Sequence, residues 1–257
     1  MKRYPFIALF KAEHYKTKNN LAVLLFLLAP FAATLISYAM NIGYTTDYPT
    51  NPWTNLIGRK LVILYLFYPM LISIFTYSLF DMEYRNNNLR RLFTSPFSVN
   101  KIFTAKILFL TEIVFFSTLI AYLSFISGGF VSSYLSPELL FQDYDIRLAC
   151  FYLHVRLLTG LLTVSFIQFF LSMTVRNFVI PIGFGGFMTI FSFISNVIPS
   201  MKDYNHLNPY FAILNSINDF INYQSVSFEK NDYVCLVYLF VFLLINLFTF
   251  KFRKYNS

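Results

Sequence analysis

Residues 107–131 read ILFLTEIVFFSTLIAYLSFISGGFV, and Glu112 is the one charged residue in this stretch. A helix of about 20 mostly apolar residues crosses the hydrocarbon core of a bilayer. Five further apolar stretches occupy residues 21–42, 61–80, 148–175, 178–199 and 233–250. The sequence therefore predicts an all-α polytopic membrane protein with six transmembrane helices, and it leaves almost no room for a soluble domain.

The composition agrees with a single transmembrane domain over residues 1–257. Hydrophobic residues make up 57% of the chain and charged residues 12%, whereas a soluble domain averages about 25% charged residues. The 19 tyrosines suit the headgroup zone of a membrane. Cys150 and Cys235 lie at or within apolar stretches, so the sequence indicates no disulfide framework.

The distribution of charge predicts the orientation in the membrane. Of the 20 Lys and Arg residues, 14 lie before the first stretch, between the second and third, between the fourth and fifth, and after the sixth. The positive-inside rule places these segments, and with them both termini, in the cytoplasm. The basic face would meet anionic headgroups and a cytoplasmic partner. This sidedness, rather than the net charge of +8 alone, argues against nucleic-acid binding.

Three polar segments carry further information. Residues 1–20 predict an amphipathic helix in the membrane interface, for which a generic basic anchor is the plainer interpretation. Residues 81–106 form a cytoplasmic segment with five basic groups, longer than a simple connection needs, which indicates a partner. Near its end a helix should begin close to Val99 and run into the third span. In residues 200–232, apolar side chains recur at helical spacing from Tyr210 to Ile221, which predicts a helix on the outer surface or capping the bundle.

Polar residues and helix breakers inside the apolar stretches leave alternatives open. Glu112 should face protein or water, paired with Lys106 or with another basic group of the cytoplasmic side. His154 and Arg156 either snorkel to the interface, or Arg156 lines a polar path or binds an acidic group outside. Pro181 and the glycines around Gly185 favour either close helix packing or a hinge.

Several catalytic signatures are absent from the sequence. It holds no G-x-x-x-x-G-K-[ST] stretch, so the chain has no P-loop for ATP hydrolysis. It contains neither H-E-x-x-H nor G-x-S-x-G, and its three histidines are scattered. One intramembrane acid is fewer than ion-coupled carriers use. We therefore expect no enzyme and no cofactor bound by this chain, but a channel-like subunit that is passive or powered from outside.

Two motifs resemble type-2 ABC exporter (ABC-2) permeases. Residues 11–30, KAEHYKTKNNLAVLLFLLAP, are similar to the family's elbow helix and first span, with Glu13, Lys16 and Lys18 in the elbow. Glu83, followed by NLRRLFTSP at residues 88–96 and by Lys106, is similar to the family's cytoplasmic loop. Among subgroups, the chain looks most like the lantibiotic or bacitracin-type permeases of peptide-antibiotic immunity and export.

The resemblance implies a role for each segment. The loop 81–106 would contain a coupling helix that fits a groove in a separate ATP-binding subunit, where ATP and Mg²⁺ would bind. Leu92 or Phe93 would be the buried knob of this contact, and the external helix would close or shape the exit. The implied coupling residues are Glu83, Leu89, Arg90, Arg91, Leu92, Phe93 and Pro96, and the candidates for a substrate path or gate are Glu112, Arg156, Pro181, Gly185, Phe211 and Leu214.

The function implied is that of a permease subunit in the bacterial plasma (inner) membrane. It would export an amphipathic peptide or lipid-like substrate, and it would pair with an identical or related permease because two are needed to enclose a path. Two alternatives remain open. One is a membrane enzyme acting on lipid through Glu112 or His154, and the other is a structural or signalling subunit that transports nothing.

Overall fold

The computed structural model describes residues 6–41, 51–84, 97–135, 137, 141–223 and 227–256. Within these residues the chain is helical and has no strand, which confirms the all-α prediction. The α-helices are α1 (Phe6–Thr17), α2 (Leu21–Asn41), α3 (Pro52–Tyr84), α5 (Val99–Leu135), α6 (Arg147–Thr174), α7 (Val179–Val197), α8 (Phe211–Tyr223) and α9 (Lys230–Asn256). Two 3₁₀ helices, η3 (Phe141–Asp143) and η4 (Pro199–Leu207), join them.

Each of the six apolar stretches falls largely within one long helix, namely α2, α3, α5, α6, α7 and α9 in chain order. Helices suit a bilayer because every backbone hydrogen bond closes within the segment. Among the described residues, α5, α6, α7 and α9 are long and apolar enough to span, and the bent pair α1–α2 is a fifth candidate. The chain is a multi-pass membrane protein, and the count of six spans stays a prediction.

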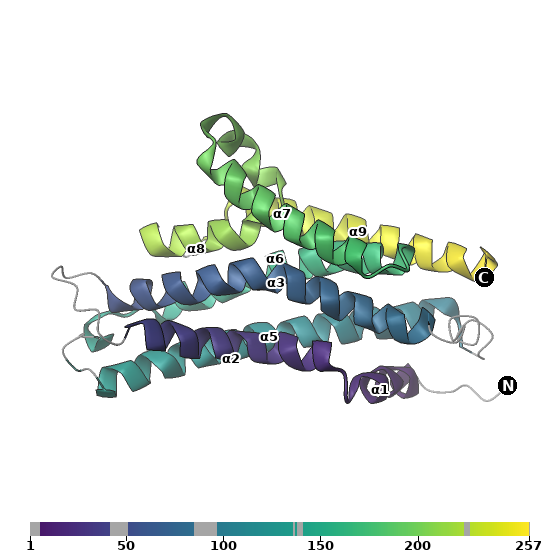
Figure 1. Ribbon diagram of the computed structural model, residues 1–257, viewed down its shortest axis with the longest axis horizontal. Helices are drawn as coiled ribbons and strands as arrows, with labels where there is room; N and C mark the ends of the chain where they lie inside the picture. Colours follow the sequence, from purple (N-terminus) through teal and green to yellow (C-terminus); the bar gives the residue numbers. More distant parts are fainter. Residues whose placement is uncertain are drawn as a thin grey trace.

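The long helices pack lengthwise around an aromatic core. In Figure 1, α2, α3, α5 and α6 run along the long axis, and α9 packs against α6. Phe26 of α2 stacks on Phe75 of α3 with 5.5 Å between ring centroids, and Phe80 meets Phe169 of α6 at 4.7 Å. These rings are fully buried. Aromatic pairs in such geometries stabilise a core beyond the area that they bury.

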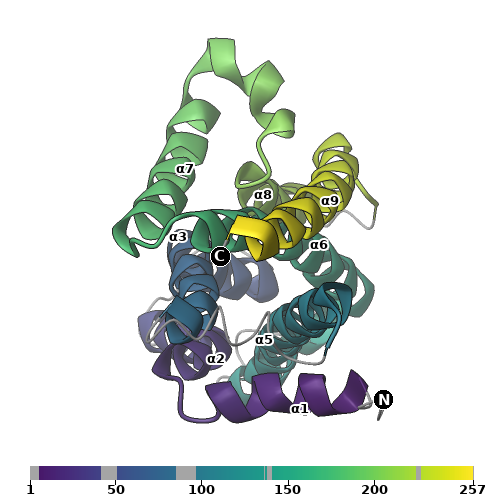
Figure 2. The same ribbon diagram turned by 90° about the vertical axis from the view of Figure 1, so that its right-hand side faces the viewer.

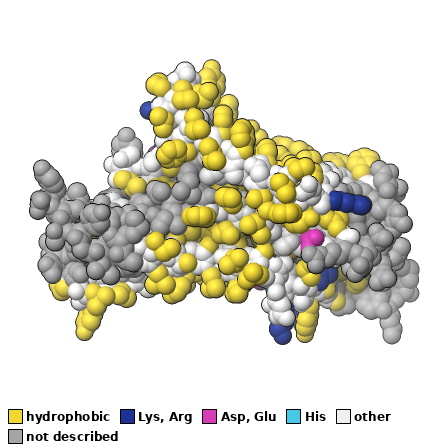
Figure 3. Space-filling view, viewed as in Figure 1, with side chains coloured by type: hydrophobic (Ala, Val, Ile, Leu, Met, Phe, Trp, Pro, Cys, Tyr) yellow, Lys and Arg dark blue, Asp and Glu magenta, His cyan; other side chains and the backbone are white. Residues whose placement is uncertain are grey.

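Helix α7 slants away from the other helices and carries η4 at its far end (Figures 1 and 2). Large apolar side chains of α7 are exposed, among them Phe187, Ile190 and Val197. Hydrophobic side chains also cover much of the face in Figure 3. An apolar surface of this extent is typical of a chain that faces lipid or another membrane subunit.

The chain turns by 81° between α1 and α2. Asn20 makes this corner, because its Oδ1 accepts a hydrogen bond from the backbone N–H of Ala22 at 2.9 Å and thereby caps α2. The Asn20 side chain also donates to Ser78 Oγ of α3 at 3.0 Å. As a result α1 runs across the end of the bundle (Figure 2), at the same end as the last turn of α9 (Figure 1).

Helix α3 extends beyond its predicted apolar stretch and ends at Tyr84. Helix α5 begins at Val99, where the sequence predicted the start of a helix that runs into the third span. The predicted segment 81–106 therefore includes the last turn of α3 and the first two turns of α5. Its implied coupling residues Leu89, Arg90, Arg91, Leu92, Phe93 and Pro96 lie outside the described residues, and their roles stay predictions.

Candidate functional site

Lys106 of α5 is the centre of a buried charge network. Its side chain is 1% exposed. Its Nζ forms an ion pair with Glu83 of α3 and lies 3.2 Å from Glu13 Oε2 of α1. Both carboxylates are buried as well. A buried ammonium group costs several kcal/mol unless it is paired and hydrogen-bonded, and here two carboxylates from two other helices supply the pairing.

Lys16 completes the network and balances its charge. Its Nζ lies 2.9 Å from Glu13 Oε1 and 3.4 Å from Glu83 Oε1. Each of the four groups therefore contacts two groups of opposite sign. Burial raises the pKa of Glu13, but Lys106 and Lys16 outweigh this effect and hold the pKa below its ordinary value of 4.5. The network, defined as Glu13, Lys16, Glu83 and Lys106, is neutral overall and joins α1, α3 and α5.

This network unites residues that the two family-like motifs singled out separately. Glu13 and Lys106 are 93 positions apart in the sequence. Helical spacing explains how α1 reaches the network, because Leu9, Glu13 and Thr17 recur every four residues and form its buried face. Lys18, the third predicted elbow residue, lies off this face and is exposed.

Glu112 has a different partner from the one first considered. Lys106 and Glu112 are six residues apart on α5, which is about 240° around the helix, so a pair between them is sterically unsuitable. Instead Glu112 Oε2 lies 3.0 Å from His14 Nε2 of α1. His14 is thus the partner in the structure, and its place on the cytoplasmic side stays a prediction.

Two contacts position the His14 ring. His14 Nδ1 lies 3.1 Å from the carbonyl oxygen of Phe10, which accepts only, so Nδ1 carries a hydrogen. Its Nε2 faces Glu112 Oε2, so the ring of His14 lies between α1 and α5.

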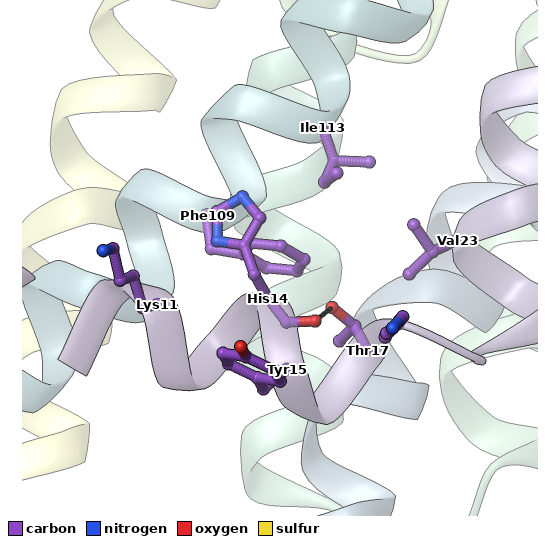
Figure 4. A pocket seen from close by; sticks show the side chains of 8 residues that line it. Lys11, His14, Tyr15, Thr17, Val23, Phe109 and Ile113 are labelled. Carbon is purple, nitrogen blue, oxygen red and sulfur yellow. Dashed lines mark hydrogen bonds between the residues drawn. The ribbon is translucent and has the colours of Figure 1, made fainter. Parts of the chain in front are cut away.

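A crevice of about 620 Å³ lies beside the network, between α1, α2 and α5. Figure 4 shows His14 projecting from α1 toward Phe109, with Ile113 and Val23 beyond it. The lining residues are Lys11, His14, Tyr15, Thr17, Lys18, Val23, Phe109 and Ile113. The sequence did not reveal this crevice, because it depends on the 81° corner that brings α1 against α5.

The end of α3 is also fastened to the end of α6. Tyr84 directs its hydroxyl to the carbonyl oxygens of Ser172 and Met173, at 2.9 Å and 2.6 Å. Two turns earlier on α3, the Tyr77 hydroxyl donates to the carbonyl of Arg176 at 3.1 Å. The last two turns of α3 are thus attached to α1, α5 and α6.

A second buried charge cluster lies toward the other end of the molecule. Arg156 of α6 is 2% exposed, with Nη2 2.6 Å from Asp219 Oδ2 of α8 and Nε 2.7 Å from Asp232 Oδ2 of α9. The snorkelling interpretation of Arg156 is therefore wrong. The arginine binds acidic groups of the polar segment that precedes the last span. His154 is buried too, and its Nδ1 lies 2.8 Å from the Cys150 carbonyl.

The remaining predicted path or gate residues contribute to packing. A Cβ atom on Gly185 would lie 2.4 Å from Ser73 Oγ and 2.9 Å from Gln168 Nε2, so α7 approaches α3 and α6 through this glycine. This contact favours packing over a hinge at Gly185. Pro181, Phe211 and Leu214 are buried, and their roles in a path or gate stay predictions.

Comparison with known proteins adds a family to this geometry. A family model described as ABC-2 family transporter protein matches residues 9–192, well over half of the chain. The match includes all four residues of the network and Arg156. No curated protein and no solved structure matches significantly. The chain therefore belongs to the ABC-2 family of transporter membrane proteins.

Proposed function

We propose that this chain is the permease subunit of an ATP-driven ABC exporter in a bacterial plasma membrane, with both termini in the cytoplasm. A separate subunit would bind and hydrolyse ATP with Mg²⁺. The observation that carries the proposal is the buried charge network, because it joins α1 to the two helices that flank residues 85–98. Family membership supports the transporter role.

The network explains how a partner that binds residues 85–98 would act on the membrane helices. Glu83 is one residue from the end of α3, and Lys106 is seven residues from the start of α5, about 10 Å along that helix. A displacement of the segment moves both helix ends. Through Glu13 and Lys16 it also moves α1, which would lie along the inner membrane surface because it meets α2 at 81°.

Alternating access requires that the ends of α1, α3 and α5 move together when the partner moves. ATP-driven closure of two ATP-binding subunits would supply the free energy that biases the permease between inward-facing and outward-facing states. A second permease, identical or related, would enclose the path. The aromatic-rich apolar character of the chain suits an amphipathic peptide or lipid-like substrate, such as an antibiotic peptide, and the external helix α8 would shape the exit.

The geometry weakens the alternative of a membrane enzyme. His154 packs against Tyr122, with 5.2 Å between ring centroids. Tyr122 is ten residues beyond Glu112 on α5, which is about 15 Å along the helix. Glu112 and His154 therefore do not form an acid–base pair. A structural or signalling subunit without transport is the alternative that the experiment below must exclude.

The test is affinity isolation of the tagged chain from its native membrane in gentle detergent, with mass spectrometry and an ATPase assay. We expect an ATP-binding protein to accompany the chain. Leu92→Asp with Phe93→Asp should abolish this, whereas Leu207→Asp, an exposed leucine of η4, should not. Isolation of the chain without an ATP-binding protein, or equal retention by both variants, would overturn the proposal.

A further inference from the structure

Two lysines at the crevice have no acidic partner among the described residues. Lys11 of α1 and Lys18, in the turn directly after α1, are both exposed. Neither has an ion pair within the part of the chain that the structure describes. The buried charge network holds two lysines and two glutamates and is therefore neutral. Among the described residues, the lining of the crevice includes Lys11 and Lys18 and no acidic side chain, so it carries positive charge.

The opposite wall of the crevice is apolar. Val23 of α2 and both Phe109 and Ile113 of α5 form it (Figure 4). From the next residue onward, α2 carries a stripe of exposed apolar side chains: Leu24, Leu28, Phe31 and Leu35. The volume of about 620 Å³ falls within the range of small-molecule sites. A ligand that fits this crevice therefore has an anionic head and an apolar tail.

We infer that the crevice binds one anionic phospholipid of the inner leaflet. Lys11 and Lys18 would contact the phosphate, and an acyl chain would cover Val23, Phe109 and Ile113 and continue along the leucines of α2. A soluble phosphate would use the lysines but leave the apolar wall in contact with water. A neutral lipid would cover the wall but leave two ammonium groups without a counter-ion.

The position of the lipid gives it a mechanical consequence. Lys11 of α1 and Lys18 of the following turn line the crevice, and Glu13 and Lys16 of the same helix α1 belong to the buried charge network. An occupied crevice would hold α1 against α5 at the point where the network fastens it. Lipid binding itself requires neither ATP nor a partner, so the inference goes beyond the proposed transport function and stands apart from it.

The experiment is native mass spectrometry of the full-length chain in detergent, titrated with 1-palmitoyl-2-oleoyl-phosphatidylglycerol or with phosphatidylcholine of the same chains. The wild-type chain should retain one phosphatidylglycerol in clear preference to phosphatidylcholine. Lys11→Gln with Lys18→Gln should weaken phosphatidylglycerol binding roughly thirty-fold, because each lysine near an anionic headgroup contributes about fivefold.

The matched control is Lys202→Gln with Lys230→Gln, which removes two exposed lysines of η4 and α9 that do not line the crevice. This variant should bind phosphatidylglycerol as the wild type does. Equal loss in both variants would mean that net charge alone retains the lipid, and the inference would be wrong. Displacement of the lipid by inorganic phosphate at equal concentration would identify a phosphate site and would likewise overturn it.

Discussion

Replacing Lys106 by Met removes the central cation of the buried charge network. Methionine has nearly the length of lysine, so the change deletes a charge with little loss of volume. Glu83 would then retain Lys16, whose Nζ is 3.4 Å away, as its nearest cation among the described residues. Glu13 would keep the same lysine at 2.9 Å. Two buried carboxylates would therefore share one half-buried ammonium group.

The expected cost follows from the burial of the partners that remain. Breaking a buried ion pair by removing one member costs about 3–5 kcal/mol, because an uncompensated charge is left in the interior. Lys101→Met is the matched control, since Lys101 is exposed on the same helix. Surface substitutions of this kind change the free energy of unfolding by about 0.5 kcal/mol or less.

The assay is equilibrium unfolding in mixed micelles, followed by circular dichroism as denaturing detergent is increased. Lys106→Met should lose about 3–5 kcal/mol relative to Lys101→Met. Adding Glu83→Gln to Lys106→Met should recover part of that loss, and the double-mutant cycle should give a coupling energy of about 1–3 kcal/mol. Equal stability of the two methionine variants, with no coupling to Glu83, would refute the network as a structural element.

Three further substitutions test other parts of the structure by the same unfolding assay. Gly185→Ala should destabilise the chain by about 1–3 kcal/mol through overpacking, whereas Gly183→Ala, whose Cβ meets nothing within 4 Å, should be neutral or slightly stabilising. Arg156→Met should cost about 3–5 kcal/mol, because the two aspartates that it binds would face each other without a cation. Because the Glu13 pKa is held below 4.5, its ion pairs stabilise the fold above that pH, and this stabilisation is lost as the pH falls through the lowered pKa. Glu13→Gln should therefore lower the free energy of unfolding at neutral pH and flatten its dependence on acid pH. An unchanged pH profile would contradict the role given to Glu13.

The length of the apolar stretches predicted the helices well. Each apolar stretch became one helix because a run of about 20 apolar residues in lipid has no other way to satisfy its backbone. Helix ends were less predictable. Polar residues from Asp81 onward marked the predicted loop, yet α3 continues to Tyr84, because a helix can continue beyond the apolar run where a side chain such as Glu83 finds partners.

The chemistry of the site was predictable in residue type but not in pairing. The family-like motifs pointed to Glu13, Lys16, Glu83 and Lys106 without showing that they meet, because ion pairs across 67 to 93 positions depend on how helices pack. The Asn20 corner, which sets the direction of α1, carries a weak local signal in the sequence. Arg156 illustrates the same limit: its partners Asp219 and Asp232 are distant in the chain, so a surface position looked equally reasonable.

The central claim is that this chain transports substrate by using ATP hydrolysed in a separate subunit. The most direct measurement is export from proteoliposomes that contain the chain together with the ATP-binding subunit isolated with it. We expect ATP-dependent movement of an amphipathic peptide across the bilayer, lost when the ATPase is inactivated or when Leu92 and Phe93 are both replaced by Asp. Transport or chemical turnover that persists with the chain alone, or with an inactive ATPase, would contradict the account.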